Sequence, residues 1–223
     1  MAFANAGSQR WIQVAVNRRP DLLLSSLRAA GAISESTTID WASPLEVDAC
    51  CEYRDATALK KAGIEALPVR PLNDFWPARG PVWDAIGRTT EGVAIFVEAK
   101  AHIPEAASPG TRASPTSLEL ISRSLEEARR WYAPKASASW TGTFYQYANR
   151  LAHHYFLREV NKVPSALVFV YLTHDPDMRG PASESEWHGA IRLLHAALGL
   201  PAQLEQRGVF DVFLDVRRLQ DGG

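Results

Sequence analysis

Two acidic residues and a lysine stand in an otherwise apolar part of the sequence. Glu98 and Lys100 end the run 93–100, whose β-branched and aromatic residues are typical of a strand. Side chains two positions apart on a strand share a face, so this carboxylate and this ammonium group should be neighbours. Asp84 stands in a second apolar segment, residues 81–86. Burying charged groups on a strand face costs free energy, so their presence here indicates a function. Two carboxylates with a lysine can hold a divalent cation beside a phosphate group.

The register of the hairpin formed by these two strands decides whether the carboxylates meet. A four-residue turn would pair Asp84 with Ile95 and place the two carboxylates on opposite faces. A three-residue turn over residues 89–91 would pair Asp84 with Phe96, which leaves Glu98 one diagonal step away, about 7–8 Å between backbones. A five-residue loop or a bulge would also bring the carboxylates together. The sequence does not choose among these registers.

The rest of the chain predicts the elements that position these residues. Apolar stripes, capping residues and apolar runs indicate helices mixed with strands, which favours an α/β fold with a mixed central sheet flanked by helices. We expect a single domain over residues 1–223, with a core at about 44–173, an N-terminal helix and a C-terminal helix and strand. The expected helices cover 20–30, 44–62, 118–132, 144–160 and 184–198, and the expected strands cover 81–86, 93–100, 165–173 and 208–216, with a turn at 87–92 and a mobile loop at 101–117.

Composition indicates a globular protein. The chain has 223 residues with 24 Lys+Arg, 25 Asp+Glu and a net charge of -1, and 46% of its residues are hydrophobic. These values argue against a disordered chain and against a globally basic nucleic-acid coat, although a local basic cleft is still compatible with them. The adjacent Cys50 and Cys51 supply neither a disulfide framework nor a metal-binding spacing. Without a secretory signal or an apolar run of about 18 residues, we expect a cytoplasmic protein and no contact with a membrane.

Asp84, followed by Glu98-Ala99-Lys100 at the end of the next strand, resembles the motif of the PD-(D/E)XK nuclease superfamily. That motif has an acid, a spacer, then Asp or Glu, any residue, and Lys. The resemblance covers about residues 44–173, with one expected helix before the motif and one after it. The proline departs from the pattern, because Pro81 lies three residues before Asp84 rather than next to it. The resemblance implies a restriction-endonuclease-like fold and metal-dependent hydrolysis of phosphodiester bonds in DNA.

The same resemblance implies a role for each residue of the motif. Asp84 and Glu98 would be the carboxylate ligands of Mg²⁺ or Mn²⁺, and the backbone carbonyl of Ala99 would also coordinate the ion. Lys100 would position or activate the attacking water and stabilise the negative charge of the transition state.

Two expected helices offer further residues. On the helix before the hairpin, Asp48, Glu52 and Asp55 fall on one face, and the resemblance favours Glu52 as an additional metal ligand. A solvated acidic face is an equal alternative. On the helix after the hairpin, Gln146 and Arg150 share a face, and Gln146 resembles the polar residue that faces the catalytic site in some superfamily members. A stripe that merely faces solvent is the alternative here.

Two other functions compete with the nuclease hypothesis. The chain could be a non-catalytic nucleic-acid-binding or regulatory module with the same fold. It could also be an interaction protein in which Glu98 and Lys100 form an ordinary ion pair. DNA is the expected partner of the first two functions, and a homodimer or a partner protein would supply specificity, because no separate recognition domain is visible. A titration with divalent ions separates the nuclease from the other two.

Overall fold

Five strands form the sheet that carries the charged residues singled out above. The computed structural model describes residues 3–220, so Met1 and Ala2, which belong to the segment expected to carry no secretory signal, lie outside the described residues. The strands lie in sequence order across the sheet, as β1 (Ile39–Ser43), β2 (Ala85–Thr89), β3 (Ala94–Lys100), β4 (Ser165–Thr173) and β5 (Val209–Asp215). The first three strands pair antiparallel and the last three pair parallel. The expected mixed sheet is confirmed.

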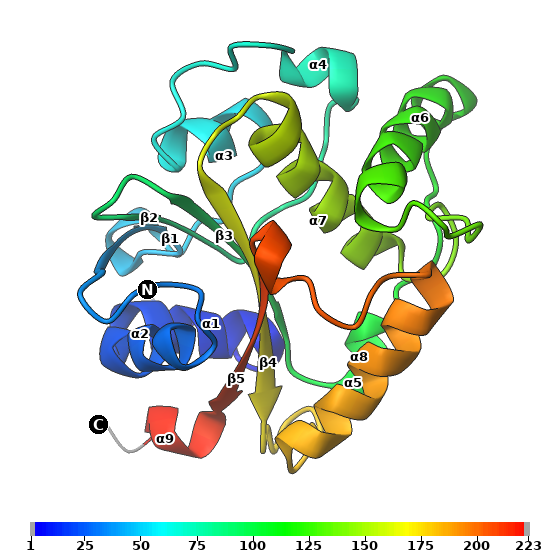
Figure 1. The fold of residues 1–223 in the computed structure, drawn as a ribbon. Coiled ribbons are helices and arrows are strands. Elements are labelled where there is room, and N and C mark those ends of the chain that lie inside the picture. Colours follow the sequence, from blue (N-terminus) through cyan, green and yellow to red (C-terminus); the bar gives the residue numbers. More distant parts are fainter. Residues whose placement is uncertain (1–2, 221–223) are drawn as a thin grey trace.

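Helices cover both faces of the sheet (Figure 1). One face packs against α1 (Gly7–Asn17), α2 (Pro20–Ala29) and α9 (Val216–Gln220). The other face packs against α6 (Pro115–Tyr132), α7 (Tyr145–Tyr155) and α8 (Glu184–Leu198). Shorter elements complete the fold: α3 (Asp55–Lys61), α4 (Leu72–Phe75), α5 (Ile103–Ala106), the 3-10 turns η1 (Glu46–Asp48) and η3 (Glu205–Arg207), and the π-helical turn η2 (Phe156–Val160).

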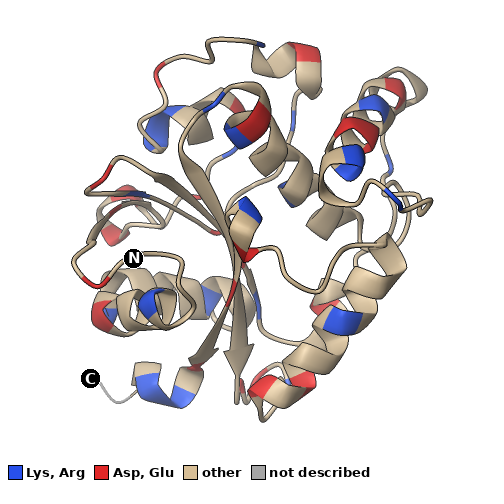
Figure 2. Ribbon diagram, viewed as in Figure 1, with Lys and Arg blue, Asp and Glu red and all other residues tan. Residues whose placement is uncertain are grey.

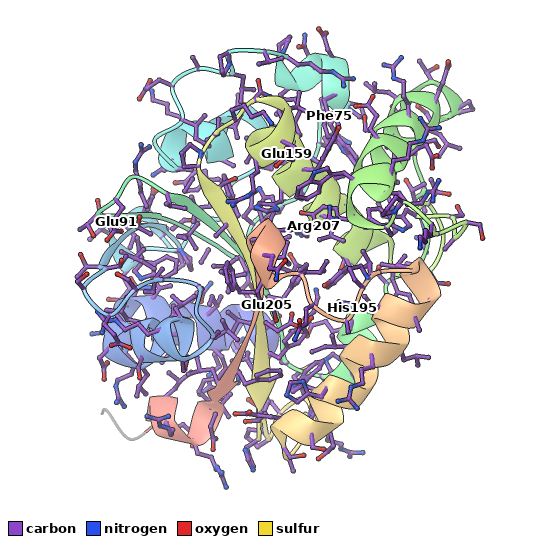
Figure 3. The ribbon with its side chains drawn as sticks, in the orientation of Figure 1. Phe75, Glu91, Glu159, His195, Glu205 and Arg207 are labelled. Carbon is purple, nitrogen blue, oxygen red and sulfur yellow. The ribbon has the colours of Figure 1, made fainter. Side chains whose placement is uncertain are left out.

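The core is divided into two layers by β4, whose nine residues are all buried. Phe169 and Tyr171 pack toward α7 and α8, while Val168 and Val170 pack toward α1 and α2. Strands buried on both faces read as continuous apolar runs, which is why the sequence predicts this strand with its correct bounds. The layer on the α7 side extends to α4, which carries Phe75 (Figure 3). Phe75 is fully buried and stacks on Phe156 with ring centroids 4.5 Å apart.

The β2–β3 hairpin has a three-residue turn over residues 90–92, because Thr89 N donates to Val93 O at 2.9 Å. Its last residue is a glycine with φ 83°, the left-handed conformation that this class of hairpin loop requires. Ala85 pairs with Val97 at the end of the ladder, and Asp84, the residue before it, donates its backbone N–H to the Val97 carbonyl at 3.1 Å.

The structure decides among the registers that the sequence left open. The three-residue turn lies one residue later than the option over 89–91, and Ala85 rather than Asp84 is the last residue of the ladder. The strand expected at 81–86 also has different bounds, since β2 begins at Ala85 and not at residue 81. Residues 81–84 leave the regular ladder because Trp83 forms a bridge to Tyr53 on another segment.

The helix expected over 44–62 is wrong. Glu46–Asp48 form only a 3-10 turn, and Ala49 and Cys50 both have φ 54°, a left-handed conformation that stops a helix. The bridge from Tyr53 then keeps the chain extended until α3 begins at Asp55. The expected loop at 101–117 is likewise interrupted by α5, and its end belongs to α6.

Charges of both signs are interspersed over the outer helices (Figure 2). None of the helices within residues 3–220 has the length and apolar character that crossing a bilayer requires.

Candidate active site

The two acids singled out in the sequence lie at the same end of the hairpin. Asp84 immediately precedes β2 and donates its backbone N–H to the carbonyl of Val97, the neighbour of Glu98, at 3.1 Å. One oxygen of Asp84, Oδ2, accepts a hydrogen bond of 2.6 Å from the backbone N–H of Ala99. Burial raises the pKa of Asp84 to about 8, and the negative charge of Glu98 adds to the rise. The half-buried Asp84 and the buried Glu98 repel each other, so a cation beside them would be stabilised.

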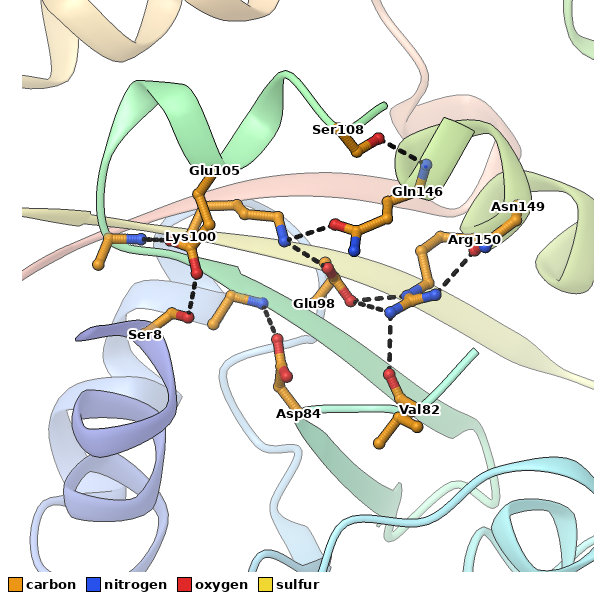
Figure 4. A network of polar contacts seen from close by, with 12 residues as sticks. Ser8, Val82, Asp84, Glu98, Lys100, Glu105, Ser108, Gln146, Asn149 and Arg150 are labelled. Atoms are coloured by element: carbon orange, nitrogen blue, oxygen red, sulfur yellow. Dashed lines mark hydrogen bonds and ion pairs between the residues drawn. The ribbon is translucent and has the colours of Figure 1, made fainter. Parts of the chain in front are cut away.

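Glu98 forms ion pairs with two cations (Figure 4). Lys100 Nζ lies 2.6 Å from Oε1, and Arg150 Nε and Nη2 both lie 2.6 Å from Oε2. Glu98 is only 3% exposed. Burial alone would raise its pKa, but the charges of Arg150 and Lys100 outweigh that effect and hold the pKa of Glu98 below its ordinary value. The expected alternative of an ion pair between Glu98 and Lys100 is therefore present as a contact.

The guanidinium group of Arg150 is fixed by further contacts besides Glu98. Its Nη1 donates to Asn149 Oδ1 at 2.7 Å and its Nη2 donates to the carbonyl of Val82 at 2.9 Å. The guanidinium carbon lies 5.1 Å from the ring centroid of Trp83, which places the charge over an aromatic face. These contacts tie α7 to the segment that carries Asp84.

Gln146 reaches the same site from the first turn of α7. Its Oε1 accepts a hydrogen bond of 3.3 Å from Lys100 Nζ, and its backbone N–H donates to Ser108 Oγ at 2.9 Å. Gln146 and Arg150 are four residues apart on the helix, so both side chains point from one face of α7 toward β3 (Figure 4). Lys100 is thereby fixed between a carboxylate and an amide oxygen.

The three acids expected on one helical face do not lie together. Asp48 pairs with Lys61 at 2.9 Å, and Asp55 accepts from the backbone N–H of Gly80 at 2.8 Å. Glu52 is the exception, because burial raises its pKa and the charge of Glu98 adds to that rise. Glu52 therefore stands at the edge of the site, on an extended segment rather than on a helix.

The start of α1 contacts both sides of the site. Gln9 Nε2 donates to Glu52 Oε1 at 2.9 Å, and Ser8 Oγ donates to Glu105 at 2.7 Å. Glu105 in turn accepts from the backbone N–H of Ala101 at 2.7 Å. The cavity beside Glu98 has a volume of about 10 Å³, room for roughly one water molecule.

A wider groove of about 600 Å³ lies elsewhere, along α3 and α4. Its lining is mainly apolar, with Leu59, Ile64, Leu72 and Trp76. None of the four residues expected to be catalytic lines this groove.

The oxygen donors of the site fit a hard divalent cation. Among residues 3–220 there is no group of three or more His, Cys, Asp or Glu side chains placed to hold a metal. Mg²⁺ does not need such a group, since it is commonly held by one or two carboxylates, with water and substrate phosphate completing its shell. Asp84 and Glu98 supply those carboxylates, and the Ala99 carbonyl points to the same side of β3 as its N–H, toward Asp84.

Two neighbouring histidines on α7 are buried without joining the site. His154 Nε2 donates to the carbonyl of Ser165 at 3.2 Å, so its Nδ1 accepts from the hydroxyl of Tyr132 at 2.6 Å. His153 Nδ1 donates to the carbonyl of Asn149 at 2.8 Å. Burial lowers the pKa of each histidine to about 4.

We expect this histidine pair to destabilise the fold in acid. The unfolded chain binds protons near the ordinary pKa of 6.5, so stability present above that pH is lost as the pH falls toward 4. The loss amounts to about 3 kcal/mol per histidine at most. Urea unfolding at about pH 7 and about pH 4.5 measures it. His154→Gln should flatten the dependence, whereas His188→Gln, at an exposed position, should not. Equal stability of the wild type at both pH values would contradict the prediction.

Some residues of the site were missed by the sequence reading. Ser8 and Gln9 were missed because α1 was not predicted, although the spacing of Trp11, Ile12 and Ala15, all buried, was the available signal. The contact between Glu105 and Ala101 has no signal in the sequence.

Comparisons of the chain with protein-family models, with curated proteins and with solved structures found no match. The assignment of a function therefore depends on the geometry of the site alone.

Proposed function

We propose that this chain is a metal-dependent phosphodiester hydrolase of the PD-(D/E)XK type that acts on DNA. The observation that carries the proposal is the hydrogen bond of 2.6 Å from the backbone N–H of Ala99 to Asp84 Oδ2, which holds Asp84 beside the end of β3. Lys100 shares a strand face with Glu98, and its Nζ lies 2.6 Å from Glu98 Oε1. An acid just before one strand, and an acid and a lysine at the end of the next, is the arrangement of the sequence motif.

The roles of the residues follow from their contacts. Asp84 Oδ1, Glu98 Oε1 and the Ala99 carbonyl would hold Mg²⁺, which when bound supplies positive charge to the phosphate under attack. Lys100 orients the attacking water and stabilises charge developing on the phosphate oxygens. Gln146 holds the ammonium group of Lys100 in place. Glu52, which accepts a hydrogen bond from Gln9, would be an additional metal ligand.

A non-catalytic DNA-binding module is the second candidate. The ion pairs that Glu98 forms with Lys100 and Arg150, and the small volume of the cavity beside it, favour it. In that case the same residues would stabilise the fold and the outer surface would contact DNA.

The test combines cleavage and binding. We expect the purified chain to cut plasmid or single-stranded DNA with Mg²⁺ or Mn²⁺, and to lose this activity with a chelator or in the Asp84→Asn variant, which removes a charged ligand. DNA binding in Ca²⁺ is measured in parallel. Binding without cleavage in any metal would support the second candidate. Neither binding nor cleavage would leave an interaction protein as the better description.

A further inference from the structure

We infer that Arg150 is a fixed counter-ion that restricts the candidate site to a single divalent cation. The inference deepens the proposed function and rests on it for the identity of the cation. It concerns the number of acceptor positions on the Glu98 carboxylate that are left for a metal ion.

The first step is a count of acceptor positions on Glu98. A carboxylate offers about four lone-pair positions, two on each oxygen. Arg150 directs both Nε and Nη2 at Oε2, each at 2.6 Å, and so occupies that oxygen. Lys100 takes one position on Oε1. Glu98 therefore retains one free position, on Oε1, and can act only as a monodentate ligand.

The second step is that Arg150 is not displaced at low cost. Its side chain is 7% exposed, and its other N–H groups donate to Asn149 and to the Val82 carbonyl. A guanidinium group withdrawn from Glu98 would still be inside the protein, with its charge unpaired. A metal ion therefore binds beside Arg150 and does not replace it.

The third step is the balance of charge. Asp84, Glu98 and Glu52 carry three negative charges when ionised, and Lys100 and Arg150 carry two positive ones. One divalent ion makes this set positive by one unit, which suits a phosphate diester. In two-metal sites the two ions lie about 3.5–4 Å apart. Glu98 could help to hold a second ion only through its other oxygen, Oε2, and Arg150 already occupies that oxygen. The guanidinium group thus supplies the charge that a second metal supplies in two-metal sites.

The inference is tested by counting bound Mn²⁺ with electron paramagnetic resonance on the full chain. We expect one ion per wild-type chain. Arg150→Gln should bind Mn²⁺ at least about 10-fold more tightly or take a second ion, because a unit charge a few ångströms away is removed. Arg150→Lys retains the charge but loses the contact through two nitrogens. Its Mn²⁺ affinity should lie between that of the wild type and that of Arg150→Gln. Arg158→Gln is the matched control, since Arg158 is a half-buried arginine of η2 that donates to the Ser165 carbonyl and has no part in the site.

The outcomes separate this inference from the proposed function. Two ions on the wild type, or a folded Arg150→Gln variant that binds Mn²⁺ as the wild type does, would overturn the inference even if DNA is cleaved. One Mn²⁺ on a wild type that cleaves no DNA, beside an Arg150→Gln variant that binds Mn²⁺ more tightly or binds two ions, would support the inference and end the hydrolase proposal. A wild type that binds no Mn²⁺ would overturn the inference. If Arg150→Gln does not fold, as judged by circular dichroism, the wild-type count and Arg150→Lys decide.

Discussion

Lys100→Met is expected to reduce DNA cleavage by about 10²–10⁴-fold while Mn²⁺ binding is retained. Methionine preserves the approximate length of the side chain, but it removes the ammonium group that we propose acts on the phosphate. Because a positive charge beside the metal site is lost, Mn²⁺ affinity should stay the same or increase. Glu98 keeps its ion pair with Arg150, so the fold should persist. Single-turnover cleavage rates and Mn²⁺ titration measure the two effects on the same preparations.

A useful comparison is Gln146→Ala, which removes the amide oxygen 3.3 Å from Lys100 Nζ but leaves the ammonium group in place. Its cleavage should fall by less than that of Lys100→Met. A Lys100→Met variant that cleaves DNA at the wild-type rate would eliminate the lysine from the chemistry.

Glu98→Ala should lower the free energy of unfolding by about 3–5 kcal/mol, because it leaves Arg150 and Lys100 buried without their carboxylate. The double variant Glu98→Leu with Arg150→Met should recover most of this loss, since it replaces the buried pair with apolar groups. Urea unfolding of the two single variants and the double variant gives the coupling between the residues.

The matched control is Glu159→Ala, which removes a carboxylate from a 3.0 Å pair with the exposed Lys162. Exposed pairs contribute little, so this variant should lose less than about 1 kcal/mol. Similar losses of unfolding free energy in Glu98→Ala and Glu159→Ala would show that the buried ion pairs of Glu98 contribute no more to stability than an exposed pair.

The strands of the core could be predicted because their signals are local. The run over residues 165–173 is apolar throughout, and Glu98 and Lys100 stand out within a similar run. The register could not be predicted, because it depends on which residues of 87–92 form the turn and a shift by one residue changes the facing pair. The helix expected at 44–62 failed because Ala49 and Cys50 adopt a left-handed conformation for which their residue types have no preference.

The candidate site was predictable only in part. Asp84, Glu98 and Lys100 could be selected by type and spacing, and Gln146 by its position on a helix. Glu98 pairs with Arg150, which is 52 residues away in the sequence. This pairing depends on how α7 packs against the sheet, so residue spacing does not predict it. Glu52 lies on an extended segment and Gln9 lies on α1, and the sequence predicted neither element, so their contact could not be predicted.

The backbone groups of the site matter for protein design. Asp84 is oriented by the N–H of Ala99, and Arg150 by the carbonyl of Val82, so two of the contacts that fix the charged side chains are made by the main chain. A designer who copied only the side chains into another sheet would lose both contacts. A transplant of this site therefore has to carry the irregular approach to β2 together with the end of β3, and a scaffold with a fully regular strand at that position is unsuitable.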